Sequence, residues 1–248
     1  MGRDGQNRVR HSRLSAAADG APLVAVAHGS KDPRAAAAIS QLLAQARRRA
    51  AERDLPGLDI KAAFLDHCAP SLPQVLGALG ALDSVDSEAE CVVVPLLLTA
   101  AYHSKTDIPA RLAEARASVP GLAARYAGTL GPHPLLLAAR WRARGGWRRV
   151  VPAYASAAGP APGEAVRALR ATVADGPVVV ASYLLAPGHF ADKIRDTALA
   201  AGAAGVSAVL GDAPEVAAVI MDRYQAAAPA ELAVPLVARA QLSRTCPW

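Results

Sequence analysis

The sequence predicts an α/β protein of two duplicated parallel-sheet lobes, Rossmann-like or flavodoxin-like in architecture, with the second lobe lacking its first strand–helix unit. Two observations predict this fold. Short runs rich in β-branched residues alternate with Ala/Leu/Arg segments of helical length, which is the pattern of βαβ units and a parallel sheet. In addition, motifs of the first half return in the same order in the second half.

The first half contains four expected strands, at residues 22–27, 59–65, 91–98 and 123–128. A helix should follow the first strand, because Asp32 can accept hydrogen bonds from free amides as the N-cap and Pro33 suits the first helical position. Another helix should follow Pro109, with Thr106 or Asp107 as its cap.

Three pairs of segments carry the internal duplication. Residues 63–79 match 153–169, residues 91–108 match 177–194, and residues 130–138 match 210–218, so that His103 pairs with His189. The strand and helix expected at 22–46 have no counterpart in the second half, so its sheet should be one strand short, with a hinge near Gly145 and Gly146. The expected division is a disordered tail at 1–21, a first lobe at 22–144 and a shortened second lobe at 145–248.

Composition narrows the class of protein. The 248 residues are 52% hydrophobic, which suits a globular core, and neither a signal peptide nor a membrane-spanning run is visible, so we expect a cytoplasmic protein with no membrane partner. The formal charge of +6 with only 4% aromatic residues favours a small acidic ligand and no nucleic acid. The three cysteines are too scattered for a disulfide framework or a thiolate metal site. A sheet edge left open in the second lobe is compatible with a monomer or a homodimer.

Three polar residues follow successive strands of the first lobe: His28, Asp66 and His103. Ligands of open parallel sheets bind beyond the carboxyl ends of the strands, so these side chains can converge. Imidazoles together with a carboxylate suit Fe(II), Co(II) or Ni(II). Taken singly, each histidine could be a hydrogen-bonded structural residue and Asp66 a capping or turn residue. Their shared sheet edge favours a metal site.

The other histidines have weaker signals. His189 takes the loop position of His103 but has no duplicate of His28 beside it, so we expect it to line the cleft without holding the metal. His11 lies in the tail, His67 adjoins Asp66, and His133 lies in a Gly/Pro-flanked turn.

Four motifs in order support a family resemblance: "VAVAHGSKDPRA", "AFLDHCAPSL", "PLLLTAAYHSKTDIP" and "LGPHPLL". Over about residues 22–225 the sequence resembles the sirohydrochlorin chelatases, the CbiX and SirB type of class II tetrapyrrole chelatase. The resemblance implies a two-lobed chelatase-like fold with a cleft between the lobes, and insertion of Co²⁺ or Fe²⁺ into sirohydrochlorin for cobalamin or sirohaem. It implies metal-handling roles for His28 and His103, and places Asp66 where relatives generally have glutamate.

The implied mechanism needs no permanent cofactor, because Co²⁺ or Fe²⁺, or Ni²⁺, is a substrate. His28 and His103 would hold the metal on one face of the macrocycle and accept protons, with Asp66 orienting a histidine or serving as a third ligand. Two other functions stay open. The protein could be a tetrapyrrole or metal carrier that binds without turnover, or a phosphate-handling enzyme that uses the "HGS" loop ahead of a helix N-terminus.

Overall fold

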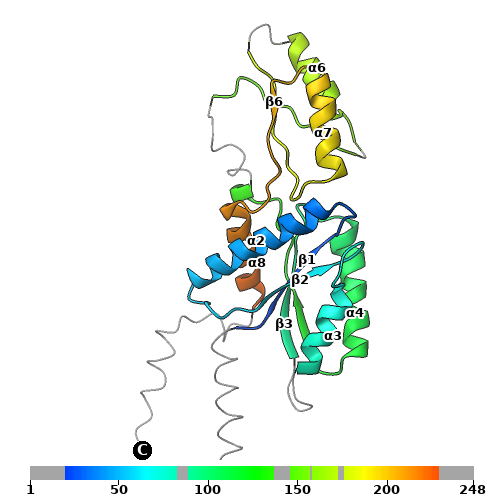
Figure 1. The fold of residues 1–248 in the computed structure, drawn as a ribbon, viewed down its shortest axis with the longest axis vertical. Coiled ribbons are helices and arrows are strands. Elements are labelled where there is room, and N and C mark those ends of the chain that lie inside the picture. The colour runs from blue at the N-terminus through cyan, green and yellow to red at the C-terminus, as the bar shows by residue number, and fades with distance from the viewer. Residues whose placement is uncertain (1–19, 83–88, 137–145, 157, 173–175, 229–248) are drawn as a thin grey trace, which may run out of the picture.

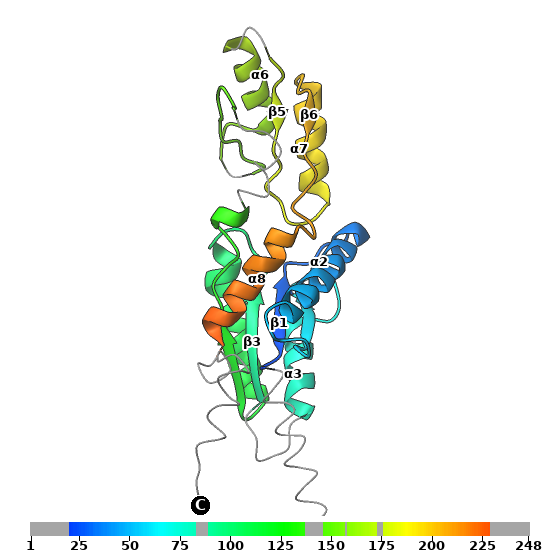
Figure 2. The same cartoon turned by 90° about the vertical axis from the view of Figure 1, so that its left-hand side faces the viewer.

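The computed structural model describes residues 20–82, 89–136, 146–156, 158–172 and 176–228, which form two lobes stacked lengthwise (Figures 1 and 2). Apart from Gly20 and Ala21, the tail expected at 1–21 lies outside the described residues, as do Gly145 of the expected hinge and Cys246. None of the described helices is long and apolar enough to cross a membrane.

The first lobe is built on a four-stranded parallel sheet in the order β2-β1-β3-β4. The strands are β1 (Leu23–Ala27), β2 (Ile60–Phe64), β3 (Ala89–Pro95) and β4 (Leu122–Tyr126). All four expected strands are confirmed, but β3 begins and ends earlier than residues 91–98. The Leu96 amide still donates to the Val26 carbonyl, and the chain then leaves the sheet, where the Leu97 carbonyl accepts from the Leu130 amide.

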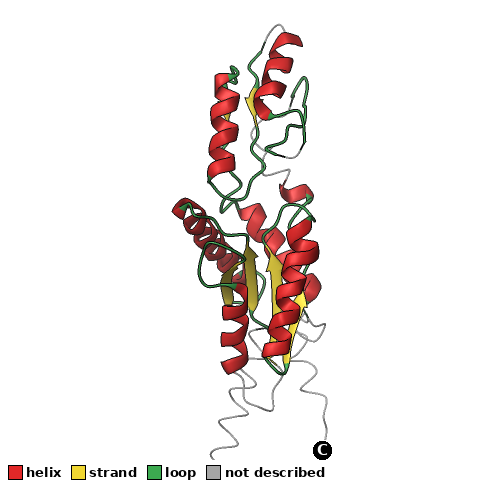
Figure 3. Ribbon diagram, turned by 90° about the vertical axis from the view of Figure 1, so that its right-hand side faces the viewer, coloured by secondary structure: helices red, strands yellow, loops and turns green. Residues whose placement is uncertain are grey.

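Three helices of the first lobe cover both faces of this sheet (Figure 3): α2 (Pro33–Ala51), α3 (Leu72–Leu82) and α4 (Ile108–Ser118). The expected cap of α2 is confirmed, because the Asp32 carboxylate accepts from the Arg34 amide and Pro33 is the first helical residue. Right-handed crossovers place α2 on one face and both α3 and α4 on the other. The α2 face therefore has apolar surface over β3 and β4 that α2 alone does not cover.

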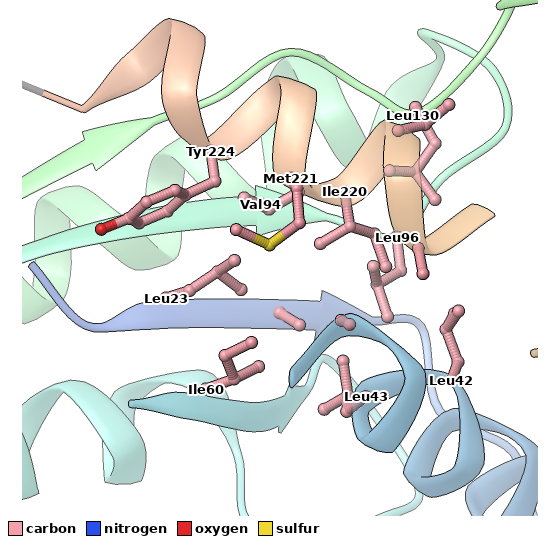
Figure 4. Close-up of a cluster of buried hydrophobic side chains, with 14 of the residues drawn as sticks. Leu23, Leu42, Leu43, Ile60, Val94, Leu96, Leu130, Ile220, Met221 and Tyr224 are labelled. Atoms are coloured by element: carbon pink, nitrogen blue, oxygen red, sulfur yellow. The ribbon is translucent and has the colours of Figure 1, made fainter. Parts of the chain in front are cut away.

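The helix α8 (Pro214–Ala227) covers this remaining surface (Figure 4). Ile220, Met221 and Tyr224 are buried in one cluster with side chains of β1, β2, β3 and α2. The Tyr224 hydroxyl donates to the Ala21 carbonyl at 2.8 Å, and Arg53, two residues beyond the end of α2, pairs with Asp222 at 2.8 Å. Although α8 belongs to the second half of the sequence, which the expected division assigns to the second lobe, its packing makes it part of the first lobe.

The sheet is buried on both faces, and side chains of β1 alternate between two cores. Leu23, Ala25 and Ala27 face α2 and α8, whereas Val24 and Val26 face α3 and α4. All five are nearly or completely inaccessible to solvent, which is the burial expected of a central parallel strand. This burial on both faces makes β1 a rigid support for the loop that follows it.

The second lobe is much smaller and contains α6 (Pro162–Thr172), β5 (Val179–Val180), α7 (His189–Ala200) and β6 (Gly205–Val206). Its two strands pair in parallel, and its compact core gathers around Val166, Val178, Ala198 and Ala203. These elements are the counterparts of α3, β3, α4 and β4. The loss of the first strand–helix unit, expected from the sequence, agrees with this order.

The second sheet lacks more strands than the one that the sequence predicts it to lack. In the described part of residues 146–161, where the counterpart of β2 should lie, no strand is assigned. In the first lobe β2 pairs with β1 and sits at the edge of the sheet. Without a counterpart of β1, a counterpart of β2 has no neighbouring strand to receive its hydrogen bonds, so losing one strand removes two.

Candidate metal site in the cleft between the lobes

The site forms where the strand order of the first sheet reverses. The chain passes from β1 outward to β2 and returns to β3 on the other side of β1, so the loops after β1 and β3 diverge and leave room for a ligand. His28 directly follows β1, and His103 follows β3. Their ring centroids lie 4.5 Å apart with the planes at 85°. The structure thus brings together the two histidines that the sequence singles out.

A five-residue π-helical turn, η1 (His103–Asp107), sets the orientation of His103. The wider turn places His103 and Asp107 on the same side, and His103 Nδ1 lies 3.2 Å from Asp107 Oδ2. Asp107 was expected to cap the next helix, as an alternative to Thr106. Asp107 does occupy the N-cap position of α4, but helical backbone already precedes α4 and the Asp107 side chain forms no capping hydrogen bond. The Asp107 carboxylate instead binds His103 and Arg111.

Hydrogen bonds determine which nitrogen of each histidine is free. His28 Nδ1 lies 3.1 Å from the Gly29 carbonyl oxygen, and His103 Nδ1 faces the Asp107 carboxylate. Both oxygens can only accept, so Nδ1 carries the proton in each ring. The lone pair of each neutral imidazole is therefore on Nε2, the arrangement usual for histidines that bind metals.

Asp107 is held between two donors. Arg111 Nε donates to Asp107 Oδ1 at 3.0 Å, and His103 donates to Oδ2. Partial burial would by itself raise the pKa of the Asp107 carboxyl, but the hydrogen bonds from Arg111 and His103 outweigh it, and the pKa lies below its usual value. Asp107 therefore stays ionised at neutral pH and keeps His103 in the tautomer that offers Nε2.

Asp66 supports the site mainly through its backbone. Its amide donates to the His28 carbonyl at 2.9 Å, and a side chain at Gly29 would meet the Asp66 carbonyl oxygen at 1.7 Å. The Asp66 side chain is 49% exposed and lies 3.9 Å from Arg111 Nη2. In the described part of the chain no three His, Cys, Asp or Glu side chains are grouped to hold a metal, so the expected trio of His28, His103 and Asp66 is not assembled.

A cleft of about 580 Å³ extends from the two histidines to the second lobe. Its first wall includes His28, Ser30, His67 and His103, and its second wall is the loop and first turn of α7, residues 184–191. His189 and Phe190 thus line the cleft, as the sequence predicts for His189. The apolar lining with a few polar groups is typical of a site for an organic ligand.

Contacts at the mouth of the cleft join the two lobes. Arg34 of α2 forms an ion pair with Asp192 of α7 at 2.6 Å, and Asp192 also pairs with Arg195. A side chain at Gly188 would lie 3.9 Å from the Ser30 hydroxyl. The two walls of the cleft therefore meet at residues next to His28 and His189.

The "HGS" loop does not resemble a phosphate site. Ser30 accepts from the Asp32 amide, and the Asp32 carboxylate occupies the N-terminus of α2 where a phosphate would bind. The Cys68 thiol donates to the Ser30 carbonyl at 3.1 Å, and Cys91 is a buried core residue whose pKa burial raises to about 11. The contacts of Ser30 give the loop a defined shape, and the Asp32 carboxylate takes the place of an anion at the start of α2.

The sequence profile of one family matches the chain twice, at residues 22–140 and 136–227. Its description is CbiX. The chain belongs to the CbiX family. The double match agrees with the internal duplication, and its shorter second part agrees with the reduced second lobe. No curated protein sequence matches the chain.

Two solved structures share the fold of this CbiX protein. SirB from Bacillus subtilis with Fe³⁺ aligns with a TM-score of 0.69 at 19% identity, covering 84% of this chain and 96% of that one. The sirohydrochlorin chelatase SirB from Bacillus subtilis subspecies spizizenii in complex with cobalt aligns with a TM-score of 0.62 at 18% identity, covering 84% and 95%. At such identities the likeness concerns the fold.

Asp107 is the site residue whose role the sequence interpretation missed. It was weighed only as a helix cap. The spacing of His103 and Asp107, four residues apart at the start of a helix, could have indicated a histidine–carboxylate pair, because residues at this spacing share one helix face.

Proposed function

We propose that this CbiX-family protein inserts a divalent metal, Co²⁺ or Fe²⁺, into sirohydrochlorin. The observation that carries the proposal is the pair of histidine rings 4.5 Å apart at the cleft. In each ring Nδ1 is engaged, and Nε2 has no hydrogen-bond partner among the described residues. The likeness to SirB structures with Fe³⁺ and cobalt supports the choice of metals. The proposed product belongs to sirohaem or cobalamin synthesis.

The cleft suits this substrate in shape and charge. A flat macrocycle between the lobes would have the His28–His103 pair on one face and the α7 loop on the other. Sirohydrochlorin carries several carboxylates, and the protein has a formal charge of +6, so approach is electrostatically favourable. Lys31 is a cationic residue of the cleft lining.

The two histidines provide a temporary metal site in this mechanism. Two neutral imidazoles replace part of the water shell of the ion but leave other positions open for pyrrolic nitrogens. Asp107 orients His103, and the Gly29 carbonyl orients His28, so neither ring has to reorganise. Two ligands also bind more weakly than a complete set, which allows release into the macrocycle. A direct role for Asp66 as third ligand stays a prediction.

The test follows the absorption spectrum of anaerobic sirohydrochlorin with Co²⁺ or Fe²⁺. We expect the wild-type protein to accelerate insertion, and His28→Ala and His103→Ala to lose most of the acceleration while remaining folded. His133→Ala is the matched control, because His133 lies in a turn where its Nδ1 accepts from the Leu135 amide, outside the cleft lining.

Two outcomes would contradict the proposal. Insertion at wild-type rates by both cleft variants would remove these histidines from the mechanism. Binding of sirohydrochlorin by the wild-type protein without any acceleration would indicate a carrier, the alternative that the reduced second lobe keeps open.

A further inference from the structure

His28 and His103, the metal pair of the proposed mechanism, leave the insertion reaction without a free base. His28 and His103 each carry a proton on Nδ1 that is hydrogen bonded, so each ring has one lone pair, on Nε2. A nitrogen that holds a metal ion cannot accept a proton at the same time. Metal insertion must nevertheless remove two N–H protons from the macrocycle. While both rings hold the ion, another group must accept the first proton.

His189 on the opposite wall meets this requirement. It is the first residue of α7 and lines the cleft from the second lobe. Gly188 before it approaches Ser30, and Asp192 one turn later is bound by Arg34, so this turn of α7 is held against the first lobe. The centroids of the His189 and Phe190 rings lie 5.6 Å apart. In the described residues no hydrogen bond engages the ring nitrogens of His189, which leaves a lone pair available.

The duplication explains why a histidine stands there. His189 is the counterpart of His103, and the ring of each packs edge-to-face with an exposed aromatic ring. The centroid of the Tyr102 ring lies 5.6 Å from that of His103, and the centroid of the Phe190 ring lies 5.6 Å from that of His189. The second lobe has no counterpart of β1 and hence none of His28. An unpaired imidazole can still bind a proton, although it lacks the second ligand of the metal pair.

We propose that His189 is the proton acceptor of metal insertion, acting on the macrocycle face opposite the metal; this inference rests on the proposed chelatase function. As the ion enters from the His28–His103 side, one pyrrolic N–H bond breaks. Its electron pair forms the metal–nitrogen bond, and the proton passes to the His189 imidazole and then to water. The second proton passes to an Nε2 that the metal has vacated. One M²⁺ enters and two protons leave, without any redox change.

Position favours His189 over His67, the other cleft histidine. His67 follows Asp66 on the first lobe, so it lies on the wall from which the ion arrives, where the positive charge of the ion opposes a departing proton. His189 receives the proton on the far side of the macrocycle. The charged groups around it are Asp192 and Lys193 on α7 and Lys31 across the cleft.

The experiment measures anaerobic insertion of Co²⁺ into sirohydrochlorin by wild type, His189→Ala, His189→Gln and His67→Ala. We expect both His189 variants to lower kcat by about 100-fold, the usual contribution of a general base, with little change in KM for sirohydrochlorin. Direct titration with Co²⁺ should give wild-type affinity, because the metal pair is intact. Added imidazole should restore much of the rate of His189→Ala, and His67→Ala should lose less of the rate than either His189 variant.

Wild-type rates in the His189 variants would overturn the inference. So would recovery by His189→Gln alone, or a loss that imidazole does not relieve, since either indicates a structural role. A larger loss in His67→Ala would assign the proton to the other wall. These failures are distinguishable from failure of the proposed function, which would appear as absence of insertion by the wild-type protein itself.

Discussion

The two lobes descend from one repeated unit but differ in their central strand. The first lobe has β1 between β2 and β3, and the sheet carries helices on both faces. The second lobe keeps two short strands and a small core. Because the loop after β1 carries His28, a lobe without this strand cannot position a second histidine beside its copy of His103. One topological loss thus explains both the thin sheet and the single histidine of the second lobe.

The comparison also shows how the lobes divide the work. The proposed metal site at His28 and His103 requires loops anchored to a sheet buried on both faces, which only the first lobe provides within the described residues. The second lobe supplies a wall of the cleft, with His189 and Phe190. The chain then runs back to the first lobe, where α8 completes the core. The following variants test this division, from the largest expected effect to the smallest.

Gly29→Ala should have the largest effect. Gly29 has φ of 91°, and an added Cβ would lie 1.7 Å from the Asp66 carbonyl oxygen, so the loop that carries His28 would have to move. Displacement of a reacting group by about 1 Å can cost roughly 100-fold in rate, which is the loss we expect in metal insertion. Gly205→Ala in β6 is the second-lobe control, since Gly205 has no positive φ and its added Cβ would meet no atom of the described residues within 4 Å. Equal losses in the two variants would contradict the proposed division.

Ile220→Ala should destabilise the protein by about 2–5 kcal/mol, the usual cost of truncating a fully buried isoleucine. Ile220 is completely buried between α8 and the first sheet. The matched variant Ile194→Ala, in α7 of the second lobe, should cost less because Ile194 keeps 8% exposure beside a small core. Chemical denaturation measures both free energies of unfolding. A greater loss for Ile194→Ala would mean that α8 contributes little to the first lobe.

Asp107→Asn should weaken Co²⁺ binding by about 10–100-fold, as loss of a partner of a metal-binding histidine usually does. An amide can offer its own N–H to His103 Nδ1 and so favour the tautomer that protonates Nε2. Asp196→Asn on α7 is a control remote from His103, and titration calorimetry with Co²⁺ compares the two. Unchanged affinity in Asp107→Asn would show that His103 needs no such orientation.

The same carboxylate predicts a pH dependence of stability. The pKa of Asp107 is lower in the folded protein than its ordinary value of 3.8, so its stabilising contribution is present above that value and is lost as the pH falls through the folded-state pKa. The difference in unfolding free energy between wild type and Asp107→Asn should therefore be constant from pH 7 to about 5 and shrink below about pH 4. A difference that vanishes already near pH 6 would assign the effect to a histidine.

Arg34→Ala should have the smallest effect. The Arg34–Asp192 ion pair joins the lobes, but the two side chains are 52% and 31% exposed, so water and salt screen it. We expect no measurable change in the unfolding temperature and a rise of roughly a few-fold in KM for sirohydrochlorin at low salt, which 1 M salt should abolish. The double variant Arg34→Ala/Asp192→Ala should be no worse than either single change. Additive losses would show that the two residues act separately.

Local patterns of the chain were sufficient to predict much of the first lobe. The four strands follow from short apolar runs, and the cap of α2 follows from Asp32 before Pro33, because such preferences act over a few residues. The positions of His28 and His103 at one sheet edge follow from the ends of the strands. Neither the π-helical turn at His103–Asp107 nor the use of Asp107 by His103 was predicted, because both depend on side-chain geometry after folding.

The sequence by itself determined the duplication, the strands of the first lobe and the pair of histidines, because periodicity, capping and strand ends depend on residues that are close together in the chain. Only the tertiary structure decided which lobe α8 joins, that the counterpart of β2 is lost with β1, and that Asp66 faces Arg111. An apolar helix face does not specify the surface that will bury it, and a strand needs a neighbour to supply its hydrogen bonds. Both depend on residues far away in the chain.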